Sequence, residues 1–277
     1  MERQKIIKMN KIWIGTNWKM NKSLSEGISY SKELMKIVEQ LHQDMEIFII
    51  PSHTSLWPIK NLIDSSRLKL GAQNMHWEDE GAFTGEISPL MLSEIGLDLV
   101  ELGHSERRQY YNENDIDINK KTHAALRNKL KPLICIGENL QQKNNQITNE
   151  IISSQLKVAL NGINEEQAAD ILIAYEPVWA IGEAGEPANS KYVAKVHSHI
   201  RNILEELYGH TGKEIPILYG GSVNQDNFLS YLDSEDVNGL FIGRAAWDLI
   251  SFKEILSSIN MSIQSLRKQN LSHINGQ

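Results

Sequence analysis

Short apolar runs alternate with longer segments of mixed polarity along most of the chain. The runs are nearly continuous in hydrophobic character, as in parallel strands that are buried on both faces. We predict strands at Lys11–Gly15, Glu46–Ile50, Leu68–Ala72, Leu97–Leu102, Lys131–Ile136, Asp170–Tyr175, Ile215–Tyr219 and Val237–Ile242. Between them, residues with helical spacing share one face, as do Leu24, Ile28, Ser31, Met35 and Val38, and later Val193, Val196, Ile200, Ile203, Leu204 and Leu207.

The order of these elements predicts the class of fold. Eight strand-then-helix units in about 250 residues favour an α/β protein built as a closed (β/α)₈ barrel, a TIM barrel. An open, doubly wound sheet is the alternative. We expect one domain over residues 1–277, with its core at about 11–258. The first nine residues are read as a short extension, and the polar stretch after Asn260 as a disordered tail.

Composition and charge exclude several classes of function. The 277 residues include 41% hydrophobic and 23% charged residues, which is typical of a globular protein. No run approaches the ~18 apolar residues that cross a bilayer, and the N-terminus has no secretory signal. A single cysteine, Cys135, suits the reducing cytoplasm and is read as a packed core thiol. The net charge of −7 argues against nucleic-acid binding.

The residues that carry chemistry gather where predicted strands end, which is where barrels of this kind place their sites. Glu176 follows an apolar run directly, and Pro177 stops the strand there because it has no N–H to donate. By itself such an acid is explained most simply by a buried salt bridge. Other strand ends, however, supply Lys19, His104 and glycine-rich turns, with no metal-ligand spacing of His, Cys or acids. We therefore expect a metal-free acid–base site with an anion pocket.

Four motifs carry a more specific likeness. They are NWKMN at 17–21, ELGHSERR at 101–108, AYEPVWAIG at 174–182 and YGGSV at 219–223. In order and spacing these motifs resemble the triosephosphate isomerase family, and the resemblance covers most of residues 11–258. It implies a cofactor-free interconversion of dihydroxyacetone phosphate and D-glyceraldehyde 3-phosphate through an enediolate.

The resemblance also implies roles for single residues. Glu176 would be the base, and His104 would be the electrophile, as a neutral imidazole at a helix start. Both are the well-known roles of this family's enzyme and come to these positions with the resemblance. Lys19 would be the fixed cation, with Asn17 a hydrogen-bond donor beside it. Glu106 could orient Lys19 or shuttle protons.

Three glycine-rich or serine turns match the family's phosphate-binding positions, at Gly182, Ser222 and Gly243, where backbone N–H groups reach an anion. Arg244 stands where the family commonly has a second glycine, and its guanidinium could add a charged contact. By resemblance, the loop at residues 81–86 would insert into a partner subunit. Thr84 would then lie near Asn17 of the other chain of a homodimer.

Two departures bear on the substrate. The segment after Gly182 reads EAGEPAN, which differs from the family's usual lid, and Arg244 is the second difference. The phrase GLFIGRAAW, together with GAQNMHWEDEGAFTGEISPLML at 71–92, resembles a divergent branch of the family in which some members act on erythrulose phosphates. The main hypothesis is the three-carbon reaction. The alternatives are the same mechanism on a four-carbon ketose phosphate and, more remotely, a non-catalytic barrel that binds sugar phosphates.

Overall fold

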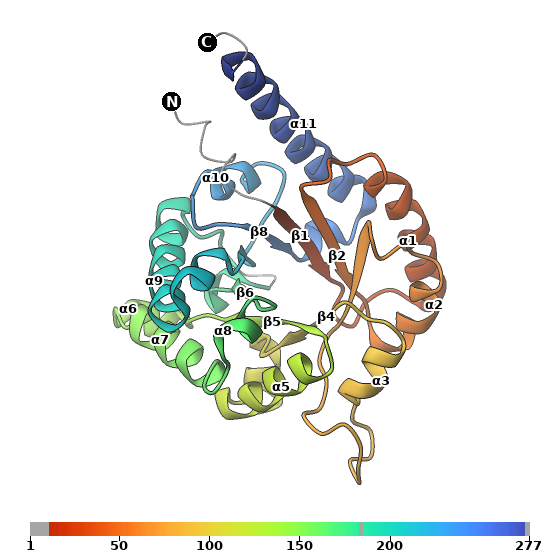
Figure 1. Ribbon diagram of the computed structural model, residues 1–277, viewed down its shortest axis with the longest axis vertical. Coiled ribbons are helices and arrows are strands. Elements are labelled where there is room, and N and C mark those ends of the chain that lie inside the picture. The colour runs from red at the N-terminus through yellow and green to blue at the C-terminus, as the bar shows by residue number, and fades with distance from the viewer. Residues whose placement is uncertain (1–10, 183–184, 275–277) are drawn as a thin grey trace.

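The structure is a computed structural model, and it describes residues 11–182 and 185–274. Its centre is a closed barrel of parallel strands in chain order, with helices around the outside (Figure 1). The strands are β1 Ile12–Asn17, β2 Met45–Ile50, β3 Leu68–Ala72, β4 Leu99–Leu102, β5 Lys131–Ile136, β6 Leu172–Tyr175, β7 Ile217–Tyr219 and β8 Gly239–Ile242. Because β8 pairs with β1, the sheet has no open edge. The predicted barrel is confirmed and the open sheet is excluded.

Helices and short 3₁₀ turns connect the strands. The helices are α1 Leu24–Val38, α2 Leu56–Lys60, α3 Pro89–Glu94, α4 Ser105–Tyr110, α5 Asp115–Arg127, α6 Leu140–Asn144, α7 Thr148–Ala159, α8 Glu165–Ala168, α9 Ser190–Glu214, α10 Phe228–Leu232 and α11 Leu249–Ile274, and the 3₁₀ turns are η2 His53–Ser55, η3 Val178–Ala180 and η4 Arg244–Ala246. Gly209, at φ 55°, interrupts α9. On α1 the burial differs from the predicted face, because Leu24 is 46% exposed whereas Tyr30 and Leu34 are buried.

Two apolar clusters hold the barrel together. One fills its interior and comprises Trp13, Phe48, Ile50, Leu99, Leu133, Cys135, Leu172, Ala174, Leu218 and Phe241. The larger one lies between the strands and the surrounding helices. Gly15 makes room for the inner cluster, since a Cβ there would lie 2.1 Å from the Phe48 ring. Because side chains fill the interior tightly, a substrate would bind at an end of the barrel and not along its axis.

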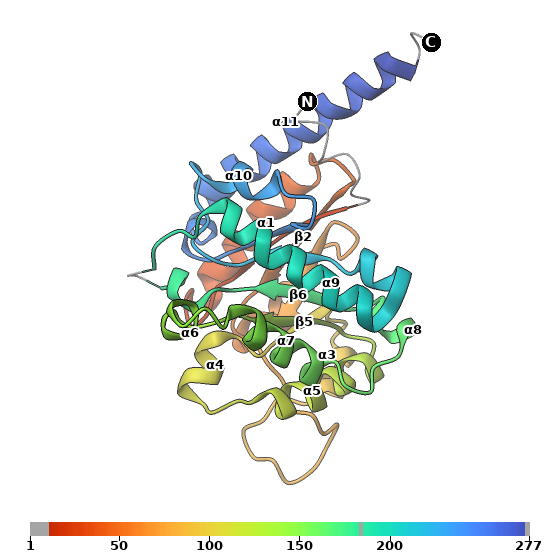
Figure 2. The same ribbon diagram turned by 90° about the vertical axis from the view of Figure 1, so that its left-hand side faces the viewer.

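The C-terminal segment differs from the prediction. The sequence suggests a disordered tail after Asn260, but α11 continues to Ile274 and extends away from the barrel (Figures 1 and 2). Ile263 is buried in the larger cluster, so the helix remains packed against the barrel for several residues beyond Asn260. The predicted N-terminal extension lies outside the described residues.

Candidate active site

A pocket of about 570 Å³ opens at the carboxyl ends of the strands. Its lining includes the catalytic, supporting and phosphate-binding residues expected from the sequence: Asn17, Lys19, His104, Glu106, Glu176, Gly182, Ser222, Gly243 and Arg244. Thr84 does not line it. Residues from the first and the last strands of the chain therefore meet in one cavity, because the carboxyl ends of all the parallel strands lie at the same end of the barrel.

Glu176 lies at the end of β6 with its side chain almost fully buried. Its backbone N–H donates to Ile136 O at 2.8 Å, which continues the β5–β6 pairing past the strand. Gly220 leaves room for its side chain, since a Cβ at Gly220 would lie 2.7 Å from Glu176 Cγ. Within the described chain, Glu176 Oε2 is buried without a hydrogen-bond partner, and its ion-pair contact is His104 Nε2 at 3.8 Å. A structural salt bridge to lysine or arginine is therefore not what holds this acid.

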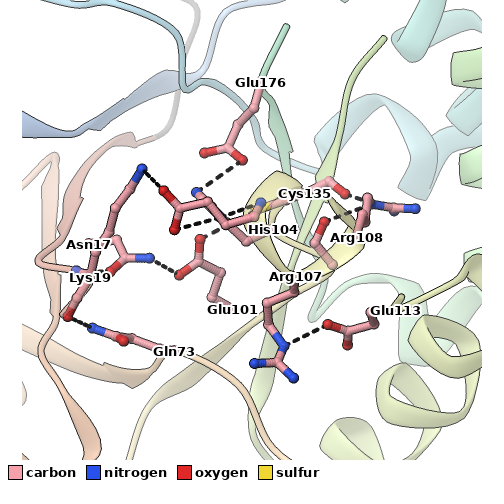
Figure 3. Close-up of polar contacts among 12 residues, drawn as sticks. Asn17, Lys19, Gln73, Glu101, His104, Arg107, Arg108, Glu113, Cys135 and Glu176 are labelled. Carbon is pink, nitrogen blue, oxygen red and sulfur yellow. Dashed lines mark hydrogen bonds and ion pairs between the residues drawn. The ribbon is translucent and has the colours of Figure 1, made fainter. Parts of the chain in front are cut away.

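His104 faces Glu176 from the start of α4 (Figure 3). Its Nδ1 accepts a hydrogen bond from the backbone N–H of Glu106 at 3.1 Å. An accepting Nδ1 carries no proton, so the imidazole is neutral and its proton is on Nε2. The positive end of the helix favours the same state. The ring thus presents an N–H donor to the pocket.

Lys19 supplies an ammonium group to the same pocket. Its Nζ lies 2.6 Å from Glu106 Oε1, an ion pair that orients the side chain. The backbone of Lys19 is left-handed, at φ 54°, and is held on both sides. Its N–H donates to Asn17 Oδ1 at 2.5 Å, and its carbonyl accepts from Gln73 Nε2 at 2.7 Å. An unfavourable backbone conformation fixed in this way is common where a side chain must be placed accurately.

Asn17 brings in two residues that the sequence motifs do not assign to the site. Its Nδ2 donates to Glu101 Oε2 at 2.5 Å, and its carbonyl accepts from Trp247 Nε1 at 2.9 Å. Glu101 is fully buried on β4, where Cys135 Sγ approaches its Oε1 at 3.6 Å. The sequence signal for Glu101 is an acid within the apolar run Leu97–Leu102.

Burial and mutual repulsion shape the electrostatics below the pocket. Burial, followed by the negative charge of Glu176, raises the pKa of the Glu101 carboxyl well above its usual range. Burial likewise raises the pKa of the Cys135 thiol, so this thiol is a packed, uncharged group as predicted. One side-chain oxygen or nitrogen from each of Glu101, His104 and Glu176 lies within 4.8 Å of the other two. These three atoms are close enough together to hold a metal ion. The metal-free site remains a prediction.

The turns after β6, β7 and β8, where the sequence predicts phosphate binding, form one side of the pocket. Gly182 has φ +86°, a conformation that favours glycine. Arg244 begins η4 without a positive φ, so its backbone tolerates a side chain there. Its guanidinium donates to the carbonyl of Gly182 at 2.8 Å. The departure from the family at Arg244 therefore ties the turn after β8 to the loop after β6. The changed segment that follows Gly182 begins at residues 183–184, which lie outside the described part of the chain.

The loop after β6 is anchored by a second buried acid. Glu138 is fully buried, and its carboxylate accepts hydrogen bonds from Tyr175, Trp179 and Tyr192. Trp179 belongs to η3, the first turn of the loop. These bonds hold the near end of the loop directly beside Glu176.

The loop between β3 and α3 projects from the barrel (Figure 1). Thr84 is exposed, and Phe83 stays 43% exposed although its ring contacts His76 with centroids 4.2 Å apart. Residues 81–86, all within the described chain, do not line the pocket of their own chain.

The fold and the site together define a class: barrel enzymes that carry out acid–base chemistry at the carboxyl ends of their strands. A family model described as triosephosphate isomerase matches residues 12–259. The chain belongs to that family, and it is an isomerase. Among the described residues, no helix has the length and apolarity to cross a membrane.

Named relatives show which members this chain is similar to. The "L-erythrulose-1-phosphate isomerase" of Rhizobium etli is 44% identical over 253 residues, which cover 91% of this chain and 94% of the relative. The protein of the same name from Brucella abortus is 42% identical over 258 residues, covering 93% of this chain and 100% of the relative. The crystal structure of triosephosphate isomerase from Bartonella henselae aligns with a TM-score of 0.79 at 35% identity, covering 88% of this chain and 97% of the other.

Proposed function

We propose that this isomerase acts on a four-carbon ketose phosphate, L-erythrulose 1-phosphate, through an enediolate. The observation that carries the reaction type is the buried, unbonded carboxylate oxygen of Glu176 facing Nε2 of His104. The relatives' names favour the four-carbon substrate over the three-carbon one of the main sequence hypothesis. The three-carbon reaction stays the second candidate, supported by the likeness to the Bartonella henselae enzyme.

The chemistry of erythrulose 1-phosphate decides which carbons react. C1 carries the phosphate and C2 the carbonyl, so the neighbouring carbon with a free hydroxyl is C3. Glu176 removes the proton from C3, and the electron pair forms the C2–C3 enediolate. Return of the proton to C2 leaves the carbonyl at C3. Because the chain is then numbered from its other end, this carbonyl becomes C2 and the product is erythrulose 4-phosphate. On this substrate a single transfer interconverts two ketoses, whereas dihydroxyacetone phosphate would give an aldose.

Three side chains near Glu176 stabilise the enediolate: those of His104, Lys19 and Asn17. Nε2–H of His104 donates to the oxygen on which charge develops, since its neutral ring can give a proton and take it back. The ammonium of Lys19 adds a fixed positive charge, oriented by Glu106. Asn17, bonded at Nδ2 and Oδ1, is held rigid and contributes its remaining amide hydrogen.

The phosphate is assigned to the turns that carry Gly182, Ser222, Gly243 and Arg244. Backbone N–H groups at such turns bind phosphate without a metal or a cofactor. Arg244 is assigned a second task because its guanidinium bonds the carbonyl of Gly182. Through that bond, binding of phosphate at one turn is coupled to the position of the loop beside Glu176.

Parallel turnover of the two substrates tests the proposal. We expect kcat/KM for L-erythrulose 1-phosphate to exceed that for dihydroxyacetone phosphate at least about tenfold, which corresponds to about 1.4 kcal/mol of barrier. Proton exchange with deuterated water, followed by NMR, detects both reactions without coupling enzymes. Higher kcat/KM on the three-carbon substrate would contradict the proposed substrate. Binding of phosphate compounds without any turnover would favour the non-catalytic barrel.

A homodimer is proposed on the resemblance, supported by the projecting loop and its exposed Thr84. We expect a dimer in sedimentation velocity at micromolar protein, and dissociation toward monomers in Thr84→Arg, because a bulky cation would obstruct insertion into a partner. Gln141→Arg is the matched control, an exposed residue on α6, on another side of the barrel. A monomeric wild type would contradict the dimer.

A further inference from the structure

Glu101 is a buried acid that the assigned roles leave unexplained. It lies on β4 opposite Leu133 of β5, and its side chain joins the interior of the barrel just beneath the pocket. Figure 3 shows its carboxyl group beneath that of Glu176 and beside Asn17. Burying a charged carboxylate is costly unless partners replace its lost water.

Two other buried acids of the described chain, Glu113 and Glu138, have such partners. Glu113 is paired with Lys121 and with Arg107. Glu138 accepts from two tyrosines and a tryptophan. Glu101 receives one amide hydrogen bond from Asn17 and a weak thiol contact from Cys135, and no lysine or arginine of the described chain lies within 4.0 Å of it. Its surroundings do not replace the hydration of a negative charge.

A second acid lies close above. Glu101 and Glu176 each have an oxygen within 4.8 Å of the other, and both side chains are buried. Two carboxylates this close in a poorly solvated place do not both ionise, and one keeps a proton. The titratable groups that face Glu101 are Lys19 from the turn after β1, His104 and Glu106 at α4, Cys135 on β5 and Glu176 after β6.

The location of the proton follows from these neighbours. The ammonium of Lys19 is already paired with Glu106, and Glu101 is more deeply buried than Glu176. The orientation of Asn17 is fixed because its Oδ1 accepts from the N–H of Lys19, so its Nδ2 must be what faces Glu101 Oε2. Oε2 is therefore an acceptor, so the proton belongs on Oε1, where the sulfur of Cys135 at 3.6 Å then accepts a hydrogen bond in place of donating one.

We propose that Glu101 is a positioning residue for the isomerase reaction: its buried carboxyl group stays protonated, holds the amide of Asn17 in place and leaves Glu176 as the ionised acid of the pair. This inference rests on the proposed function, because it takes Glu176 as the base. Burial as the first cause and Glu176 as the second raise the pKa of Glu101, in agreement with the proton's location.

The pH profile of kcat/KM tests the charge of Glu101. Glu101→Gln keeps the shape and the acceptor oxygen but cannot ionise, so we expect activity within about threefold of wild type and an unmoved acid limb. If Glu101 were ionised in the wild type, removing its negative charge would relieve repulsion in the pocket, and the acid limb would fall by about one unit or more. That shift would overturn the proposal. The titration of the substrate's phosphate is common to both enzymes and cancels.

Glu101→Leu tests the hold on Asn17. It fills the space without an acceptor, so we expect kcat/KM to fall at least about tenfold while KM changes less than kcat, because Asn17 loses its orientation in the transition state. Recovery by glutamine but not by leucine is the expected pattern. Equal activity in both variants would overturn the positioning role.

Infrared spectroscopy gives a readout that does not depend on turnover. A protonated, buried carboxyl group has a carbonyl stretching band that carboxylates lack, and we expect this band at pH 7 in the wild type and not in Glu101→Gln. Glu138→Gln is the matched control, another fully buried acid, and should retain the band. A wild type without the band would overturn the proposal. If the wild type turned over neither substrate, the proposed function would fail while the band still decided the state of Glu101.

Discussion

Replacing Glu176 with glutamine is expected to lower kcat by about 10³-fold or more, equivalent to about 4 kcal/mol of barrier. Glutamine has nearly the same shape and fits beside Gly220, but it cannot accept the proton from carbon. Within the described chain, Oε2 of Glu176 is buried and forms no hydrogen bond, so it is free to accept that proton. Steady-state kinetics on the better of the two substrates measures the effect.

The same variant should bind phosphate compounds almost as the wild type does, because the phosphate turns do not depend on the charge of residue 176. Calorimetric titration with inorganic phosphate checks this. Glu186→Gln is the matched control, an exposed acid farther along the same loop, and should keep turnover within about threefold. Undiminished turnover in Glu176→Gln would remove Glu176 as the base.

The barrel can be predicted because eight apolar runs alternate with helical segments, but the ends of the strands cannot. The predicted strands include Ile171, Ile215 and Val237, which are fully or almost fully buried and yet lie just outside the ladders. Hydrophobicity reports burial, and burial continues where hydrogen bonding between strands has already stopped. The helical tail escapes prediction for a related reason: Ile263 gives α11 an apolar contact within a segment that looks polar as a whole.

The pocket-lining residues are predictable from strand ends and motifs, whereas the role of Glu101 is not. The role of its carboxyl group depends on contacts with Asn17, 84 positions away, and with Cys135 on the neighbouring strand. An acid inside an apolar run can point into the barrel or toward the helices, and its position in the sequence does not distinguish the two. Arg244 is similar, because its bond to Gly182 spans 62 positions and exists only once the barrel is closed.

Lys19→Met is expected to lower kcat/KM by about 10³-fold, an effect close in size to that expected for Glu176→Gln. A charge about 4 Å from a developing negative charge, at an effective dielectric constant of about 20, contributes about 4 kcal/mol. Methionine keeps the length of the side chain and removes the ammonium. We expect KM to rise and kcat to fall together, since the cation attracts the anionic substrate and also the enediolate.

The control for Lys19→Met is Lys22→Met in the same turn. Lys22 also has a left-handed backbone, at φ 68°, but its ammonium donates to the carbonyl of Trp247 and lies over the Tyr30 ring, and it does not line the pocket. Its loss should change kcat/KM less than about threefold. A large effect in both variants would point to the conformation of the turn as the cause.

A double variant separates the direct effect of the ammonium from the release of its partner. Lys19→Met leaves Glu106 as an unpaired negative charge beside an anionic substrate, and this repulsion alone would weaken binding. Adding Glu106→Gln removes the repulsion but does not restore a cation. If Lys19 acts on the substrate, the double variant stays within about tenfold of Lys19→Met. Recovery to near wild-type kcat/KM would instead mean that the pair contributes only by neutralising Glu106, and Lys19 would no longer be a catalytic residue.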